Sequence, residues 1–343
     1  QYRTISLGKM NTCILNPSKC LLYKLSTNQT AIRFLPQIRR FSKTQDPKCF
    51  SVKLKSRSLV QVCGKDTLNF LQGLFTSDVN LLNDNVSQYS MMLNVQGRVL
   101  YDLLLYNMSA KKETANIWIE CASEVKDEFI QTMKKYKIRK KVDISDISKS
   151  AYVYASPNQN LTLMEDSVKL TTPDPRLPSL GNRIIVTEDL KSTDNMCVYL
   201  ESEQYYREHR YKLGIGEGIT DLPPGSCFPL ESNLTFLKGV SFEKGCYIGQ
   251  ELTARTFHTG VTRKRLMPLV FENVPAGFNP DSSITSEKGK SAGKLRDFIG
   301  IYGLGLMRVA ETKGDLNIID IKGNKLKVKA DIPSWWPSEN HML

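Results

Sequence analysis

A pair of apolar segments joined by a short polar turn is the feature that most constrains the fold of this chain. The sequence VSQYSMMLNVQGRVLYDLLLYN at 86–107 is apolar on both sides of Asn94-Val95-Gln96-Gly97. Asn and Gly are typical of the turns that join antiparallel strands. The sequence therefore predicts a β-hairpin over residues 86–107.

The other predicted elements mix strands with a few helices. Alternating apolar patterns predict strands at 50–54, 58–63, 115–121, 142–147, 151–155 and 183–187. Helical spacing of apolar residues predicts helices at 67–75, 124–138 and near 200–213. Residues 156–182 are predicted to be a long loop, and residues 214–262 a loop with short helices. From residue 263 onward, short strands with Gly and Pro turns predict a small β-barrel or sandwich. The shift in composition near residue 260 marks the expected domain boundary.

The positive charge of the chain is concentrated in its N-terminal segment. The whole chain carries 47 Lys and Arg against 35 Asp and Glu, whereas residues 1–41 carry seven basic residues and no acidic one. This composition, ending in Arg39-Arg40-Phe41-Ser42, is typical of a mitochondrial transit peptide. A basic arm that binds an acidic partner is the alternative. We expect residues 1–41 to be removed on import.

Composition also narrows the classes of function. The remaining 302 residues carry only five more basic than acidic residues, which speaks against a nucleic-acid-binding protein. No apolar run approaches the roughly 18 residues of a membrane-spanning helix. None of the eight cysteines forms a C-x-x-C pair, and only three histidines are present. Cys63 and Cys121 lie in apolar strand patterns and are expected to be buried, inert thiols.

The segment KGCYIGQE at 244–251 is the strongest candidate for chemistry. Gly245 and Gly249 flank Cys246 and permit sharp turns or close approach of a partner. The positive charge of Lys244, with Arg255 one helical turn after Glu251, would favour the thiolate of Cys246. A thiolate is a nucleophile and a soft ligand for iron. The local residues alone leave a structural and a reactive cysteine equally open.

Two features near this motif, His258 and a short basic run, are predicted to be exposed to solvent and to have no catalytic role. His258 lies twelve residues after Cys246, which allows a Cys/His hydrolase pair, but no third group or oxyanion motif accompanies it. An exposed polar histidine is therefore expected. The basic run Arg263-Lys264-Arg265 is expected to form a solvated face.

The motif at 244–251 resembles the signature of the tetrahydrofolate-binding YgfZ/GcvT family. Further segments that are similar to this family occur in order, namely FLQGLFTSDV (70–79), LNVQGRVLYDLLLY (93–106), DPRLPSLGNR (174–183) and LPPGSCFPLESN (222–233). The resemblance covers about residues 50–310. It implies an α+β fold with intertwined, aminomethyltransferase-like folate-binding α/β lobes over 48–260. A small C-terminal β-barrel domain over 261–343 would follow.

The resemblance also implies the site residues. Lys244, Gly245, Cys246, Tyr247, Gly249, Gln250 and Glu251 would form the functional motif, with Cys246 as the metal ligand. Asp102, Glu231 and Arg255 would bind tetrahydrofolate. Aminomethyltransferases of the family usually carry two adjacent acids where this chain has Tyr101-Asp102, so Tyr101 departs from the transferase pattern. Solvent exposure of Asp102 and helix capping by Glu231 are the plainer alternatives.

Two classes of function follow from the resemblance. The favoured one is a non-catalytic or weakly catalytic assembly factor of the mitochondrial matrix that acts late in the maturation of [4Fe–4S] proteins. It would share an iron–sulfur cluster with an A-type scaffold protein through Cys246. The alternative is a folate-dependent aminomethyl or one-carbon transferase.

Overall fold

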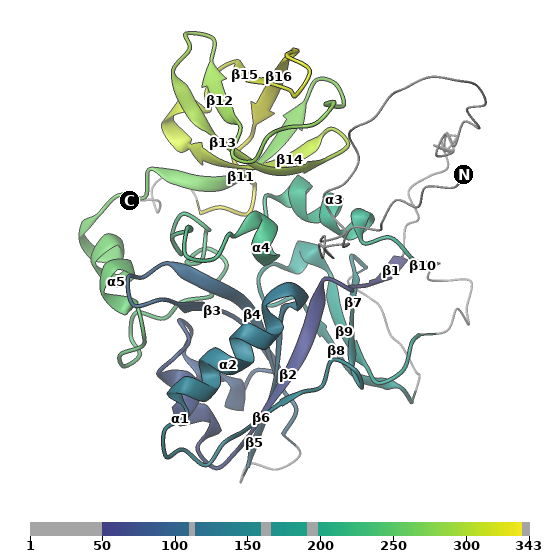
Figure 1. The fold of residues 1–343 in the computed structure, drawn as a ribbon, viewed down its shortest axis with the longest axis vertical. Coiled ribbons are helices and arrows are strands. Elements are labelled where there is room, and N and C mark those ends of the chain that lie inside the picture. Colours follow the sequence, from purple (N-terminus) through teal and green to yellow (C-terminus); the bar gives the residue numbers. More distant parts are fainter. Residues whose placement is uncertain (1–49, 110–113, 159–165, 191–197, 338–343) are drawn as a thin grey trace, which may run out of the picture. The chain divides into compact units, whose positions relative to one another are not determined.

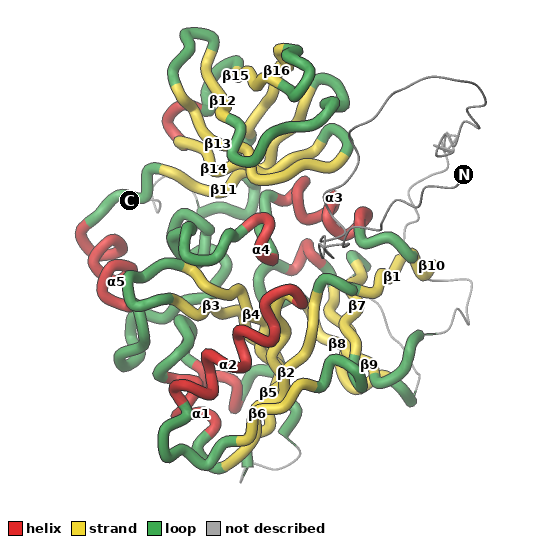
Figure 2. The backbone as a smooth tube through the Cα atoms, viewed as in Figure 1, coloured by secondary structure: helices red, strands yellow, loops and turns green. Residues whose placement is uncertain are grey.

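Two five-stranded sheets and a closed six-stranded barrel make up the part of the chain that the structure describes (Figures 1 and 2). This computed structural model describes residues 50–109, 114–158, 166–190 and 198–337. The expected transit peptide, residues 1–41, lies outside the described residues. Four short 3₁₀ helices accompany the other elements, at Val79–Asn83, Ser123–Val125, Pro178–Leu180 and Val309–Glu311.

The first sheet contains the predicted hairpin. Its strand order is β3 (Ser87–Leu93), β4 (Val99–Asn107), β5 (Ala115–Ala122), β2 (Arg57–Gly64) and β6 (Asp143–Asp146), and all neighbours are antiparallel. Helices α1 (Thr67–Gln72) and α2 (Lys126–Tyr136) pack against this sheet (Figure 1). The predicted hairpin is therefore confirmed, and it lies at one edge of this sheet.

The second sheet departs from the sequence prediction at two places. Its strand order is β10 (Val198–Leu200), β1 (Phe50–Lys53), β7 (Tyr152–Ser156), β9 (Asn182–Val186) and β8 (Val168–Pro173). Strand β8 lies inside the segment predicted to be a long loop. Only one of its six residues, Thr172, is buried, and its apolar alternation is confined to Val168 and Leu170, which is too short to predict a strand. Helix α3 (Gln204–Leu213) begins later than predicted, after β10.

Strand β4 is buried on both of its faces, which explains its nearly continuous apolar sequence. Leu104 and Tyr106 belong to the core that also holds residues of the second sheet, such as Ile185. Leu103 and Leu105 belong to the separate core beneath α1 and α2. Because side chains alternate along a strand, Asp102 falls on the same face as Leu104 and Tyr106, between the two sheets.

The C-terminal barrel confirms the predicted domain type. Its strands are β11 (Lys264–Phe271), β12 (Ser283–Ser286), β13 (Ser291–Ile299), β14 (Tyr302–Arg308), β15 (Leu316–Ile319) and β16 (Lys325–Ala330). They close in the order β11-β14-β13-β12-β15-β16. Its core is apolar and includes Met267, Phe271 and Trp336. Closure removes the two exposed edges that an open sheet would have.

The barrel is joined to the preceding lobes by side-chain hydrogen bonds. Trp335 Nε1 donates to the backbone oxygen of Leu213 at 2.8 Å, and Asn233 Nδ2 donates to that of Leu266 at 2.9 Å. Helix α3 also packs against β11, β13 and β14 (Figure 1). Helix α3 therefore links the barrel to the lobes, through its packing on three barrel strands and through the hydrogen bond from Trp335.

The segment at 214–262 contains α4 (Gly218–Asp221) and a longer helix, α5 (Gln250–Thr259). Within α5 only Thr253 is buried, so the helix has no apolar stripe at helical spacing to reveal it in the sequence. Among the described residues, no helix is both long enough and apolar enough to span a membrane.

Candidate functional site

Residues 240–249, which we call the Cys246 loop, are held at their N-terminal side by strong backbone contacts. The ammonium of Lys244 donates to the carbonyl oxygens of Phe75 and Ser77, both at 2.7 Å. The backbone N–H of Ser241 donates to the carbonyl oxygen of Thr76 at 3.0 Å. Burial lowers the pKa of Lys244 to about 8, because the surrounding chain removes water from the ammonium. Lys244 thus fastens the loop to residues 75–77.

The C-terminal side of the same loop rests on the turn of the β3–β4 hairpin. Gly249 has a φ of 78°, and a side chain there would collide with the carbonyl oxygen of Asn94. Gly97 also has a φ of 78°, and a Cβ on it would lie 3.0 Å from the carbonyl oxygen of Gly249. The N–H of Ile248 donates to the carbonyl oxygen of Gly73 at 3.1 Å. The two glycines therefore permit a close approach of two backbone segments of the same chain.

Cys246 lies between these two attachments and is exposed. Its neighbour Gly245 is also exposed, and a Cβ built on it would contact nothing within 4 Å. Gly245 has no positive φ, so its backbone conformation does not require glycine. The ammonium of Lys244 is bonded to backbone carbonyl oxygens and fastens the loop, and its effect on the Cys246 thiol stays a prediction.

The remaining motif residues continue into α5. Tyr247 is buried and belongs to the core between the sheets. Gln250 begins α5, and its Oε1 accepts from the N–H of Tyr247 at 3.4 Å. Glu251 and Arg255 are exposed on α5. His258 is exposed near the end of α5, as expected.

The other three described cysteines are less accessible than Cys246. Cys121 and Cys227 are buried, and burial raises their thiol pKa to about 12 and about 11. Cys63 was expected to be buried but is only half-buried. It is the second-to-last residue of β2, which ends at Gly64. Cys246 is thus the exposed thiol among the described residues.

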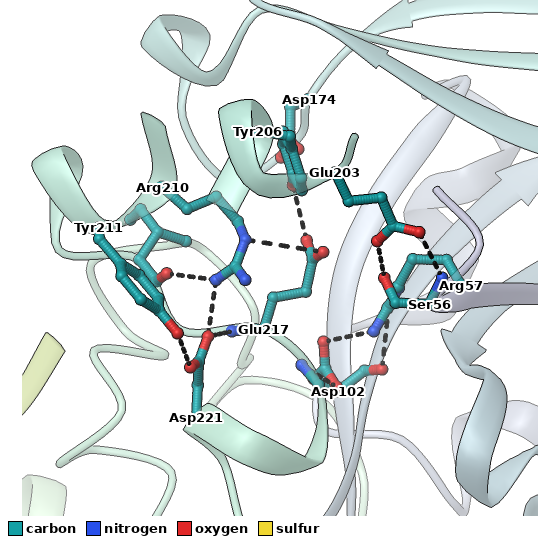
Figure 3. Close-up of polar contacts among 12 residues, drawn as sticks. Ser56, Arg57, Asp102, Asp174, Glu203, Tyr206, Arg210, Tyr211, Glu217 and Asp221 are labelled. Atoms are coloured by element: carbon teal, nitrogen blue, oxygen red, sulfur yellow. Dashed lines mark hydrogen bonds and ion pairs between the residues drawn. The ribbon is translucent and has the colours of Figure 1, made fainter. Parts of the chain in front are cut away.

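A network of buried charges lies between the two sheets and α3 (Figure 3). Its guanidinium groups belong to Arg57, Arg176, Arg183 and Arg210, and its carboxylates to Asp102, Glu120, Asp174, Glu217 and Asp221. All nine side chains are at most 7 % exposed. Because burying charge is costly unless it is paired, the network joins the elements that supply it.

Asp102 is a member of this network. Its Oδ2 pairs with Arg57 Nη1 at 3.1 Å, and its Oδ1 accepts from the N–H of Gly218 at 3.2 Å (Figure 3). Arg57 also pairs with Glu120 at 2.8 Å. The flanking apolar residues correctly predicted a buried carboxylate. Both of its oxygen atoms are engaged by β2 and by the start of α4.

The pKa values of Glu217, the N-cap of α4, and of Asp221, within α4, are shifted in opposite directions. Burial opposes ionisation of Glu217, but Arg183, Arg176 and Arg210 outweigh it and hold the pKa of Glu217 well below its usual range. Burial raises the pKa of Asp221 despite its pairing with Arg210 Nη1 at 2.7 Å. Both residues line a polar cavity of about 310 Å³ together with Arg57, Arg210 and Tyr206.

Glu231 lies in a different place from Asp102. It lines a cavity of about 460 Å³ beside α5, with Thr253, Arg263, Lys264 and Arg308. Burial raises the pKa of the half-buried Glu231 carboxyl. No side-chain hydrogen bond to Glu231 is formed by the described residues. Asp102 does not line this cavity.

Tyr101, beside Asp102, points to the opposite face of the sheet. Its hydroxyl donates to Glu128 Oε1 at 2.9 Å, and its ring packs against Phe129 at 5.2 Å. Both partners belong to α2. The residue that departs from the transferase pattern thus forms part of the core beneath this helix.

Sequence reasoning missed the buried network and the burial of Arg265. Arg265 is 7 % exposed, so the basic run that contains it is not a uniformly solvated face. The alternation of β11 carries a usable signal, because Arg265 shares its face with Met267 and Leu269 of the barrel core. The network carries no comparable signal, since its members are scattered from residue 57 to residue 221.

Comparison with known proteins supports the division of the structure into N-terminal lobes and a C-terminal barrel. Family models for the GCVT N-terminal domain and for the CAF17 C-terminal beta-barrel domain match residues 52–155 and 263–338. The crystal structure of glycine cleavage system aminomethyltransferase T from Bartonella henselae aligns with a TM-score of 0.66 at 13% identity. The alignment covers 84% of this chain and 86% of that chain. The chain therefore has an aminomethyltransferase-like fold followed by a C-terminal barrel, as predicted.

Curated relatives narrow this class. The chain is 41% identical over 310 residues to the mitochondrial iron-sulfur cluster assembly factor IBA57 of Mus musculus, covering 84% of this chain and 86% of the relative. It is 37% identical over 307 residues to the protein of that name from Homo sapiens, covering 84% and 85%. The chain thus belongs to the family of mitochondrial iron–sulfur cluster assembly factors named IBA57. The expected family and its mitochondrial location are confirmed.

Proposed function

We propose that this chain is an iron–sulfur cluster assembly factor of the mitochondrial matrix. It acts late in the maturation of [4Fe–4S] proteins, and Cys246 contributes a thiolate to a cluster shared with an A-type scaffold protein. The names of its relatives support the general role. The exposed position of Cys246 supports the specific one.

The observation that carries the proposal is the way in which the Cys246 loop is held. Lys244 attaches it to residues 75–77, and Gly249 attaches it to the hairpin turn. These contacts are on either side of Cys246 and leave the thiol exposed. A rigidly held, accessible thiolate is what an iron atom on another protein needs as a ligand.

Cys246 would supply one ligand, and the partner would supply the others. The described residues contain no group of three or more His, Cys, Asp or Glu side chains arranged for a metal ion. Iron–sulfur clusters are usually held by four protein ligands, most of them cysteine thiolates. The cluster is therefore cargo that passes between two proteins in this proposal.

Removal of the Cys246 thiol tests the proposal. Cys246→Ser changes one exposed atom, so the fold should be retained, but a hydroxyl is a poor ligand for iron in a cluster. We expect the variant to fail in restoring [4Fe–4S] enzyme activity to cells that lack the protein. A mixture of the purified variant with the A-type scaffold protein should also lose the visible absorption of the shared iron–sulfur cluster. Cys63→Ser is the matched control and should behave as the wild type. Full restoration by Cys246→Ala would exclude the ligand role.

Tetrahydrofolate fits the Glu231 cavity better than it fits the surroundings of Asp102. The Glu231 carboxylate is free to accept hydrogen bonds from the adjacent N–H groups of a pterin ring. The buried hydroxyl of Thr253, which also lines this cavity, has no hydrogen-bond partner among the described residues. Arg263, Lys264 and Arg308 would pair with the glutamate carboxylates of folate. Neither Asp102 nor Arg255 lines this cavity.

Calorimetric titration with tetrahydrofolate tests this assignment. Glu231→Gln should weaken binding by about tenfold or more, because it replaces a charged acceptor. Asp102→Asn should change the affinity little, since its carboxylate is engaged by Arg57. The reverse pattern would place folate at the buried network. Aminomethyl transfer to tetrahydrofolate by the purified chain would favour the alternative function, a one-carbon transferase.

A further inference from the structure

An apolar groove of about 670 Å³ lies beside the Cys246 loop. Three aromatic rings line it, those of Phe236, Phe242 and Phe257, together with Val261 and Arg265. The groove shares several residues with the Glu231 cavity, but Glu231 does not line it. Phe242 belongs to the Cys246 loop itself, and Phe257 belongs to α5, which begins immediately after that loop.

Arg265 is a buried cation without a carboxylate partner among the described residues. It is 7 % exposed, and its Nη1 donates to the carbonyl oxygen of Leu230 at 3.0 Å and to Asn233 Oδ1 at 3.4 Å. Its guanidinium lies 4.0 Å from the ring centroid of Phe236. By contrast, each arginine of the buried network has a carboxylate within ion-pair distance. An anion that entered the groove would supply the missing counter-charge.

The rim of the groove carries exposed apolar side chains. Phe257 is 48% exposed and Val261 is 64% exposed. The ring of Phe242 stacks on that of Phe257, with centroids 3.8 Å apart and planes at 8°. Exposed apolar surface beside a buried charge is typical of a site that another protein covers.

The segment that supplies most of the groove's lining residues is basic, which indicates the chemistry of that partner. Residues 238–265 contain six Lys and Arg, namely Lys238, Lys244, Arg255, Arg263, Lys264 and Arg265, against two acidic residues, Glu243 and Glu251. An acidic partner surface would be attracted to this segment, and a basic one would be repelled.

We propose that this groove docks an acidic segment of the protein that shares the cluster at Cys246. A carboxylate of that segment pairs with Arg265, and its apolar side chains cover Phe257 and Val261. This inference rests on the proposed function, because the partner is the same. The groove and the thiol are continuous along the chain, since Phe242 precedes Cys246 by four residues. Docking would place the partner's cluster ligands beside the thiol.

Calorimetric titration with the cluster-free form of an A-type scaffold protein tests the groove without iron. Val261→Glu places a negative charge on the exposed rim and should weaken binding by about tenfold or more. Val274→Glu is the matched control, because Val274 is 67% exposed and lies outside the groove. It should change the affinity by less than about twofold. Equal affinities of these two variants would overturn the proposal, as would absence of binding by the wild type.

Arg265→Met tests the buried cation. It should weaken binding by about tenfold or more, provided that its unfolding midpoint matches that of the wild type. If Arg265→Met is unfolded, the binding affinity of Val261→Glu alone tests the proposal. Sedimentation of the wild-type chain by itself identifies a different occupant. A dimer that Val261→Glu dissociates would show that a second copy fills the groove, and this outcome would overturn the proposal.

Cys246→Ser separates the groove from the proposed function. With the cluster-free scaffold, its affinity should stay within about threefold of the wild type, because docking uses the groove. If Cys246→Ser loses cluster absorption while Val261→Glu binds normally, the groove proposal fails and the cluster-ligand proposal stands. If Val261→Glu loses binding while Cys246→Ala restores activity, the cluster-ligand proposal fails and the groove stands.

Discussion

The two glycines on either side of Cys246 have different structural roles. Gly249 adopts a left-handed conformation and touches the backbone of the β3–β4 turn, whereas Gly245 faces open space. A non-glycine residue with positive φ costs about 1–2 kcal/mol, and a collision with a carbonyl oxygen adds to this.

We therefore expect Gly249→Ala to lower the free energy of unfolding by at least about 2 kcal/mol. Gly245→Ala is the matched control and should change it by no more than about 0.5 kcal/mol. Urea unfolding of both variants and the wild type measures the difference. Equal stabilities would mean that the hairpin turn does not support the Cys246 loop.

Lys244 makes the stability of the loop dependent on pH. Its pKa is about 8 in the folded chain, below its ordinary value of 10.5. Between these two values the folded chain has released a proton that the unfolded chain still binds. The free energy of unfolding should therefore rise with pH from about 8 to about 10.5, and it should gain nothing from this group below pH 8.

Lys244→Met removes this contribution. The difference in unfolding free energy between wild type and variant should increase in favour of the wild type as the pH is raised from about 8 to about 10. Urea unfolding at several pH values measures it. A difference that stays constant over this range would show that Lys244 titrates with an ordinary pKa.

At the scale of elements, the buried network joins strands that are remote in sequence. Arg57 begins β2, Asp102 belongs to β4, Arg183 belongs to β9 and Arg210 belongs to α3. Glu217 accepts from Arg183 Nη2 at 2.6 Å, and it also pairs with Arg176 at 2.8 Å. Loss of its charge would remove a carboxylate that Arg176, Arg183 and Arg210 share.

Glu217→Gln should therefore lower the free energy of unfolding by about 3–5 kcal/mol, although the two side chains have nearly the same shape. Lys290→Met is the control, because Lys290 pairs with Glu311 on the surface and is 67% exposed. It should cost no more than about 1 kcal/mol. A loss of under about 1 kcal/mol for Glu217→Gln would mean that the network reorganises around the missing charge.

The sequence predicted the elements with apolar periodicity and missed those without it. The hairpin, α2 and the barrel strands have clear patterns that their burial requires. Strand β8 and helix α5 each bury a single residue, so no extended apolar pattern marks them. Local residues cannot reveal an element whose position depends on partners elsewhere in the chain.

At the scale of the whole molecule, the barrel and the lobes share a core. Leu266 and Leu304 of the barrel strands belong to the same core as Val153 and Ile185 of the second sheet. Trp335 of the segment after the barrel is bonded to the end of α3. These shared contacts predict that the two parts unfold in one cooperative transition.

The three tryptophans permit a direct test, because Trp118 lies in β5 and Trp335 and Trp336 follow the barrel. Trp118→Phe leaves fluorescence from the barrel end alone, and the double change Trp335→Phe with Trp336→Phe leaves it from the lobes alone. We expect fluorescence and circular dichroism to report a single, shared transition midpoint within each variant. Midpoints that differ between the two probes of one variant would show independent unfolding.

The sequence by itself determined the mixed sheet-rich fold, the barrel and the motif around Cys246, because these features depend on neighbouring residues in the chain. Only the tertiary structure decided which motif residues fasten the loop and which face the solvent. It also showed that Glu231 lines the cavity beside α5. Asp102 became a member of a buried charge network, and Arg265 became a buried cation, because their surroundings come from distant segments. Burial and pairing are properties of the folded chain, and they decide whether a charged side chain holds the structure or remains free to bind a ligand.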